Sequence, residues 1–218
     1  PPDVRERVAQ RLTLVRLEHR QTLYEPDSII HRVYFPLNGV ASLLAVMGDG
    51  DMVEVGTTGN EGMVGTPLIL GVRTSAQEAI AQIPGDALAM EACAFVEEIE
   101  RHDAFDHLVR RYLHGYINMV SQTAACNRLH EVESRCARWL LMTHDRANSD
   151  TFPLTHEFLA HMLGVRRAGV TVALGILRRA GLVSSTPGMI TIVDRDGFEN
   201  AACECYQLVR DDFGQLLG

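Results

Sequence analysis

Residues 154–183 read LTHEFLAHMLGVRRAGVTVALGILRRAGLV, and this stretch decides the fold. Thr155 can cap a first helix, and Gly164 follows that helix as a turn residue. The second helix has apolar residues at the spacing i, i+3, i+4, i+7, which predicts one buried face made of Val170, Ala173, Leu174 and Leu177. The stretch therefore predicts a helix-turn-helix.

Burial of that face leaves Arg166, Arg167 and Thr171 pointing outward at the N-terminal end of the second helix. In helix-turn-helix proteins this end meets base edges in the major groove, where an arginine can bond guanine through two donors. We expect these residues to contact DNA; the alternative is a solvated helix face.

The following residues 182–193, LVSSTPGMITIV, predict two strands around a Pro-Gly turn, which is a wing. Hydroxyls in the wing can bond phosphate oxygens. Arg178 lies near the end of the second helix, where it either contacts phosphate or complements the negative helix end. The predicted DNA-binding set is completed by Thr155, Ser184, Ser185 and Arg178.

Charge singles out the same segment. Residues 151–193 contain four arginines and one acid, whereas the chain of 218 residues has a formal net charge of −8. A basic segment in an acidic chain is consistent with binding a polyanion there.

Upstream, residues 21–90 alternate short apolar runs with glycine and proline turns. This pattern predicts an antiparallel β-roll, preceded by a helix over residues 4–19. The class is therefore α+β.

Residues 91–146 contain one glycine and no proline, which predicts helices. The central helix has a seam at alternating spacings of 4 and 3, typical of a coiled coil: Phe105, Val109, Tyr112, Tyr116, Met119 and Thr123. A second apolar stripe contains Leu113, Ile117, Val120 and Ala124. We expect the seam to form a homodimer interface; the alternative is a helix buried within one chain.

The chain is thereby divided into a β-roll sensor domain (1–102), a dimerisation helix (103–127) and a winged helix-turn-helix domain (128–218). In the last domain we expect a helix over 129–143, a polar boundary segment over 145–151 and a C-terminal helix over 197–217.

This order of β-roll, long helix and winged helix-turn-helix resembles the Crp/Fnr family of bacterial transcription regulators. The run VYFPLNGV (33–40) is similar to the family's sensor-domain signature, and LGVRR (163–167) with Gly181-Leu182-Val183 is similar to its DNA-binding signature. The resemblance implies that Arg167 reads guanine. Ala168 and Val172 replace the acidic residue and the later arginine of the family pattern, so operator preference should differ from that of the cyclic-AMP receptor.

The resemblance also implies an effector site in the roll. Its candidate residues are Glu61, Gly62, Arg73, Thr74, Ser75 and Ser121. The phosphate cassette of cyclic-nucleotide binders has Gly-Glu followed by Arg-Ser/Thr-Ala, whereas here Glu61 precedes Gly62 and Arg73 falls two residues late. The effector therefore stays open: a cyclic nucleotide would meet an atypical cassette.

The five cysteines are scattered and odd in number, which favours reduced thiols. None precedes Cys93, so the N-terminal iron–sulfur site of some family members is not supported, nor is a haem. Cys126 and His130, four apart, are the best redox or metal pair; Cys203 and Cys205, two apart on one expected helix, would face away from each other. We expect no metal.

The sequence thus predicts a homodimeric, effector-tuned, DNA-binding transcription regulator whose partners are double-stranded DNA, a second copy and, as the resemblance implies, RNA polymerase. The alternative is a small-molecule sensor that acts through protein partners. We expect no enzyme, because no nucleophile, base and orienting group occur at a usable spacing. No run of about 18 apolar residues occurs, so we expect a cytoplasmic protein without a membrane partner.

Overall fold

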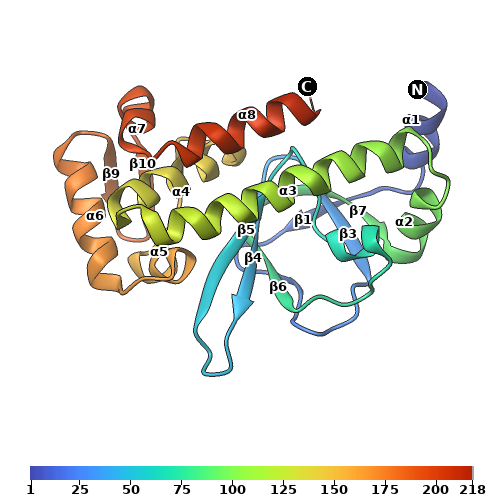
Figure 1. The fold of residues 1–218 in the computed structure, drawn as a ribbon, viewed down its shortest axis with the longest axis horizontal. Helices are drawn as coiled ribbons and strands as arrows, with labels where there is room; N and C mark the ends of the chain where they lie inside the picture. Colours follow the sequence, from blue (N-terminus) through green and yellow to red (C-terminus); the bar gives the residue numbers. More distant parts are fainter. Residues whose placement is uncertain (218) are drawn as a thin grey trace.

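The computed structural model describes residues 1–217, and its N-terminal part is a β-roll of two antiparallel sheets (Figure 1). One sheet has the order β1-β7-β3, with strands Thr13–Leu17, Gly85–Glu91 and Arg32–Pro36. The other has the order β2-β6-β4-β5, with strands Thr22–Tyr24, Gln77–Ile83, Val40–Val46 and Met52–Thr58. The predicted α+β class with an antiparallel roll is confirmed.

β4 shows why the roll has a continuous apolar core. Its first five residues, Val40–Leu44, are all buried, because β4 lies between β6 and β5 in its sheet and α4 packs against it. A strand covered on both faces is buried throughout rather than at alternate positions, and Ser42 is the one polar residue among these five.

The expected helix over 4–19 is wrong in its second half. α1 ends at Ala9, and Thr13–Leu17 form β1, which pairs with β7. Leu17 is buried whereas Leu14 is 64% exposed, which is the alternation of a half-buried strand. Pairing with β7 overrides the helical pattern of a short segment.

The helical part comprises the 3₁₀ helix η1 (Thr66–Leu70) and the α-helices α2 (Ala92–Ile99), α3 (Ala104–Leu129) and α4 (Val132–Ala147). The side chain of Asp103 caps α3 by accepting from the backbone N–H of Phe105. At 26 residues and about 1.5 Å per residue, α3 extends roughly 39 Å across the molecule (Figure 1).

The expected dimer interface on α3 needs correction. The six residues of the predicted seam face the chain's own β-roll and α8 instead of solvent: Val109, Tyr112, Tyr116 and Met119 are buried, and Phe105 and Thr123 are half-buried. Intramolecular packing against the roll uses the same 4 and 3 spacing as a coiled coil. The second stripe is the more exposed one: Ile117, which is 51% exposed, and Ala124 face solvent, and Leu113 and Val120 are half-buried.

The C-terminal part contains β8 (Thr151–Pro153), α5 (His156–Leu163), α6 (Arg167–Arg179), β9 (Val183–Thr186), β10 (Met189–Ile192), α7 (Arg195–Ala201) and α8 (Cys205–Leu217). The predicted wing is a sheet with the order β8-β10-β9. The polar boundary segment 145–151 is structured at both ends, because α4 continues to Ala147 and Thr151 pairs with Thr191 of β10.

The expected C-terminal helix over 197–217 is broken. α7 ends at Ala201, Ala202 is extended at φ −74° and ψ 155°, and α8 begins at Cys205. α8 then packs along α3, so it joins the C-terminal part of the chain to the long helix (Figure 1).

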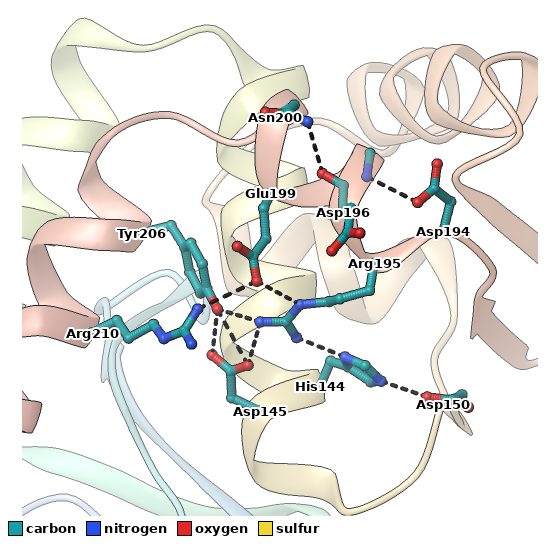
Figure 2. Close-up of polar contacts among 11 residues, drawn as sticks. His144, Asp145, Asp150, Asp194, Arg195, Asp196, Glu199, Asn200, Tyr206 and Arg210 are labelled. Carbon is teal, nitrogen blue, oxygen red and sulfur yellow. Dashed lines mark hydrogen bonds and ion pairs between the residues drawn. The ribbon is translucent and has the colours of Figure 1, made fainter.

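A polar network attaches α7 and α8 to the end of α4 (Figure 2). The guanidinium of Arg195 donates to Asp145 at 2.6 Å, to Glu199 at 2.9 Å and to Nδ1 of His144 at 2.7 Å. The Tyr206 hydroxyl lies 3.0 Å from the Asp145 carboxylate, and burial followed by that carboxylate raises the pKa of Tyr206 to about 12. α4, α7 and α8 are therefore held as one unit.

Within residues 1–217, no single helix has the length and apolar character to cross a membrane. The consecutive helices α5 and α6 reach that length and composition only when taken together, across a bend of 107°.

Candidate nucleic-acid interface

The turn between α5 and α6 has the geometry of a helix-turn-helix. Thr155 caps α5 by accepting from the backbone N–H of Phe158 at 3.1 Å, as predicted. Gly164 ends α5 with φ at +61°, a left-handed conformation that favours glycine. The two helices are bent by 107°, within the range of about 90–120° for this motif.

α6 buries the predicted face and exposes the predicted arginines. Val170, Ala173, Leu174 and Leu177 are all buried. Arg166 and Arg167 are exposed at the N-terminal end of the helix, where no side chain caps the free backbone N–H groups. Two cations at the positive end of a helix dipole create an anion-binding surface.

Thr155 and Thr171 are exposed, but their hydroxyls already have partners. Thr155 accepts the capping bond, and Thr171 donates to the carbonyl oxygen of Arg167 at 3.1 Å. The Thr171 oxygen also lies 3.0 Å from Nδ1 of His156 on α5. The Thr171–His156 contact ties α6 to the start of α5, whereas the Thr155 cap stabilises α5 itself.

The wing lies beside α6. Ser184, Ser185 and Thr186 on β9 are exposed, with Ser185 opposite Ile190 and Ser184 opposite Thr191 in β10. A cavity next to the wing is lined by Thr155, Arg167, Ser185 and Gly188, among others, so the helix and the wing share one hollowed surface. Arg178 is exposed near the far end of α6.

Val172 belongs to the same surface, although the sequence alone indicated only that it replaces an arginine and not that it contacts DNA. Its side chain is 62% exposed on α6, one residue after Thr171. An exposed apolar side chain on a recognition helix is suited to the methyl group of thymine. The sequence did contain a signal for this exposure: Val172 falls outside the set of α6 residues at spacing i, i+3, i+4, i+7 that is predicted to be buried.

The structure does not bring the six candidate effector residues into one site. Glu61 and Gly62 line a groove with α3 and α8, whereas Arg73 and Thr74 are exposed beside the loop before β3. The carboxylate of Glu61 already pairs with Arg146 at 2.8 Å. Burial acts to lower the pKa of Arg146, but the charge of Glu61, its hydrogen bond and the charge of Asp145 together outweigh burial and raise the pKa above its usual value.

Ser75 and Ser121 also lie outside the groove. Ser75 is buried, and its hydroxyl accepts from the backbone N–H of Gln77 at 3.0 Å. Ser121 is exposed on α3, and its hydroxyl donates to the carbonyl of Ile117 in the same helix at 2.9 Å. The six candidate effector residues are therefore separate features of the roll and of α3.

A tyrosine of α3 occupies the space next to Gly62. A Cβ on Gly62 would lie 1.9 Å from Cε2 of Tyr112, so only glycine fits there. The Tyr112 hydroxyl lies 2.8 Å from the hydroxyl of Thr58 and donates to the carbonyl of Met63 at 3.2 Å. Burial raises the pKa of Tyr112 above its ordinary value, so the side chain stays neutral. Tyr112 also stacks on Phe213 of α8, which connects the roll to α8.

Comparisons with known proteins identify the same architecture. The family model of the Crp-like helix-turn-helix domain matches residues 134–201. The global nitrogen regulator of Synechocystis is 24% identical over 185 residues, which cover 80% of this chain and 82% of that protein.

Solved structures also share the fold. A CRP-family transcriptional regulator from Thermus thermophilus has a TM-score of 0.70 at 21% identity, and the match covers 86% of this chain and 96% of that one. FixK2 from Bradyrhizobium japonicum has a TM-score of 0.68 at 18% identity, and the match covers 88% of this chain and 98% of that one.

Proposed function

The chain belongs to the Crp/Fnr family of transcription regulators, and from that premise we propose how it reads DNA. The N-terminal end of α6 enters the major groove, where Arg166 and Arg167 bond base edges. The observation that carries this proposal is the arrangement of α6: its apolar face is buried and both arginines are exposed at one end.

The side chains of α6 favour a particular division of roles. Arg167 is the residue proposed to read guanine through two donors, and Val172 contacts a thymine methyl group. The side chain of Ala168 cannot form a hydrogen bond with a base, so this position does not distinguish one base from another by hydrogen bonding. Operator preference follows from this set.

Phosphate contacts position the protein on the duplex. Ser184 and Ser185 of the wing and Arg178 of α6 are exposed and suited to phosphate oxygens. Thr171 supports these contacts indirectly, because its hydroxyl bonds the carbonyl of Arg167 and contacts His156 of α5. Thr155 contributes by capping α5.

Regulators of this family bind DNA and act as dimers. We assign the dimer interface to the second apolar stripe of α3, in which Ile117 and Ala124 are exposed and Leu113 and Val120 are half-buried, at spacings of 4, 3 and 4. Two such helices side by side would set the separation of the recognition helices, which must match half-sites about 34 Å apart.

Regulation would act through α8. The groove that Glu61 and Gly62 line also contains Tyr112 of α3 and Phe213 of α8. A ligand there would touch the sensor, the long helix and α8 together, so it could shift the DNA-binding part of the chain. We also propose RNA polymerase as a partner. The proposed function is regulation, and no reaction is assigned to the protein.

The test uses a pool of random-sequence DNA duplexes. Wild-type protein should enrich a two-fold symmetric sequence and bind it with an affinity that falls steeply with salt, because bound phosphates release counterions. Arg167→Ala should weaken binding by about 1–3 kcal/mol, or roughly 5- to 150-fold, and relax the preference at one base pair of each half-site.

Arg5→Ala is the matched control, since Arg5 is exposed on α1, far along the chain from α6, and should leave binding unchanged. Unaltered affinity and base preference in Arg167→Ala would reject the readout assignment. Failure of the wild type to enrich any sequence would favour the alternative, a sensor that acts through protein partners.

A further inference from the structure

Four side chains with metal-binding atoms meet where α3 ends and α8 begins. Cys126 lies in the last turn of α3, and His130 is its C-terminal cap residue. Cys203 lies in the break between α7 and α8, and Cys205 is the first residue of α8. The break removes the objection that residues two apart on a helix diverge, because Cys203 precedes the helix.

The ligand atoms have the spacing of a single tetrahedral ion. The three Sγ atoms and the histidine nitrogen all lie within 4.8 Å of one another. The Sγ atoms of Cys126 and Cys203 are 3.5 Å apart, as are Cys205 Sγ and His130 Nδ1. Zn–S bonds of about 2.3 Å and Zn–N bonds of about 2.0 Å give tetrahedron edges of about 3.5–3.8 Å.

We propose that Cys126, His130, Cys203 and Cys205 form a structural zinc site that joins α3 to α8. The donor set, three thiolates and one imidazole, is one that structural zinc prefers. All four positions are filled by protein atoms, and the three cysteines are buried. A closed site of this kind contributes stability rather than catalysis.

Neighbouring side chains orient the ligands. Nε2 of His130 lies 3.2 Å from the Glu204 carboxylate, which leaves Nδ1 free to face the thiols. The amide of Gln122 donates to Cys205 Sγ at 3.0 Å. A carboxylate behind a histidine ligand and a donor to a thiolate are the usual second layer of such sites.

Charge supports an anionic centre at this position. Three thiolates, a neutral histidine and Zn²⁺ carry one net negative charge. Arg135 and Arg138 of α4 are buried beside the thiols, and within residues 1–217 neither forms an ion pair with a carboxylate. Their Nε atoms also have no hydrogen-bond partner. The zinc–thiolate centre would place an anion beside both buried cations, of which Arg138 also senses the Glu54 carboxyl group.

The test is the metal content of the full-length protein, purified with a thiol reductant and without chelator. Native mass spectrometry and elemental analysis should find one zinc per chain. Cys205→Ser and His130→Ala should lose most of that zinc, while Cys93→Ser, which changes an exposed cysteine outside the cluster, should retain it. Glu204→Gln should weaken zinc binding by about 10- to 100-fold.

Because a ligand variant could misfold, the wild-type protein provides a second measurement. After zinc removal by a chelator under reducing conditions, addition of Co²⁺ should produce thiolate-to-cobalt and tetrahedral d–d absorption bands at one equivalent, and zinc should abolish them. Absence of zinc and of these bands, or a Cys126–Cys203 disulfide in the purified protein, would overturn the proposal. So would full zinc content in a folded Cys205→Ser variant.

Discussion

Glu54 is a carboxylate buried in the core between β5 and α4, where it is only 7% exposed. Its oxygens lie 2.9 Å from Nε1 of Trp139 and 2.6 Å from the Ser42 hydroxyl. That hydroxyl is also 2.7 Å from the amide oxygen of Gln82. Ser42 has one proton and faces two acceptors, so both contacts are satisfied when Glu54 is protonated and donates to Ser42.

Stability should therefore depend on the protonation of Glu54. Burial raises its pKa to about 7 despite the hydrogen bonds from Ser42 and Trp139. Between the ordinary carboxyl pKa and about 7, the unfolded chain releases a proton that the folded chain keeps, so this contribution is complete at low pH and is lost as pH rises. The loss amounts to about 3 kcal/mol above neutral pH.

Glu54→Gln should keep the hydrogen bonds of the protonated acid and lose this pH dependence. Urea unfolding at pH 5 and pH 8 should show the variant gaining stability relative to wild type at pH 8 by up to about 3 kcal/mol. Glu25→Gln, at an exposed position, should show no such gain. An equal difference at both pH values would mean that Glu54 is ionised throughout.

Residue-level prediction from sequence worked where the signal is local. The Thr155 cap and the Gly164 turn each depend on neighbours within about one helical turn, and both were predictable. The Glu61–Arg146 pair and the contact of Gly62 with Tyr112 join residues about fifty to eighty-five positions apart. No local pattern specifies such pairs, so the sequence could not show that Glu61 pairs with Arg146 of α4 or that Gly62 packs against Tyr112 of α3.

At the scale of a single element, α6 contains two glycines, each of which should cost up to about 1 kcal/mol relative to alanine. Tight packing does not account for Gly175, because a Cβ there would meet only Nη1 of Arg179, at 3.5 Å. At Gly169 a Cβ would meet nothing within 4 Å. Space inside the protein therefore explains neither glycine.

Close approach to DNA gives a different expectation for each glycine. Gly169 lies one turn from Arg166 on the arginine-bearing end, so Gly169→Ala should stabilise the protein yet weaken DNA binding by about tenfold or 1.4 kcal/mol. Gly175→Ala should stabilise it by about 1 kcal/mol and leave binding unchanged. Thermal unfolding and titration with the selected duplex measure both effects. If both variants bind the duplex like the wild type, Gly169 is not needed for the close approach of α6 to DNA.

Secondary-structure elements were predictable from sequence where a helix has a single apolar face and therefore packs on one side only. α6 has a single buried face, and it forms as expected. α3 has two apolar stripes with the same residue spacing, so the spacing does not predict which stripe packs against the β-roll of the same chain. The break at Ala202 carries no proline or glycine, so the pattern gave no reason to divide α7 from α8.

At the scale of the whole molecule, the proposed dimer forms through the second apolar stripe of α3, residues Leu113, Ile117, Val120 and Ala124. Ile117 is 51% exposed in the single chain, and Leu113 and Val120 beside it are half-buried. Apolar residues at spacings of 4 and 3 over residues 113–124, about 17 Å of the helix, are suited to packing against the same helix of a second copy. The buried seam cannot serve, because exposing it would open the roll.

Ile117→Asp should therefore shift the protein to monomers without unfolding it, because the Ile117 side chain is half exposed and makes few packing contacts within its own chain. Sedimentation velocity at micromolar concentration should show the shift, and affinity for a two-half-site duplex should fall much more than affinity for one half-site. Leu108→Asp is the matched control: Leu108 is 48% exposed on α3 but lies nine residues away, on about the opposite side of the helix. A dimeric Ile117→Asp variant, or equal dissociation by Leu108→Asp, would place the interface elsewhere.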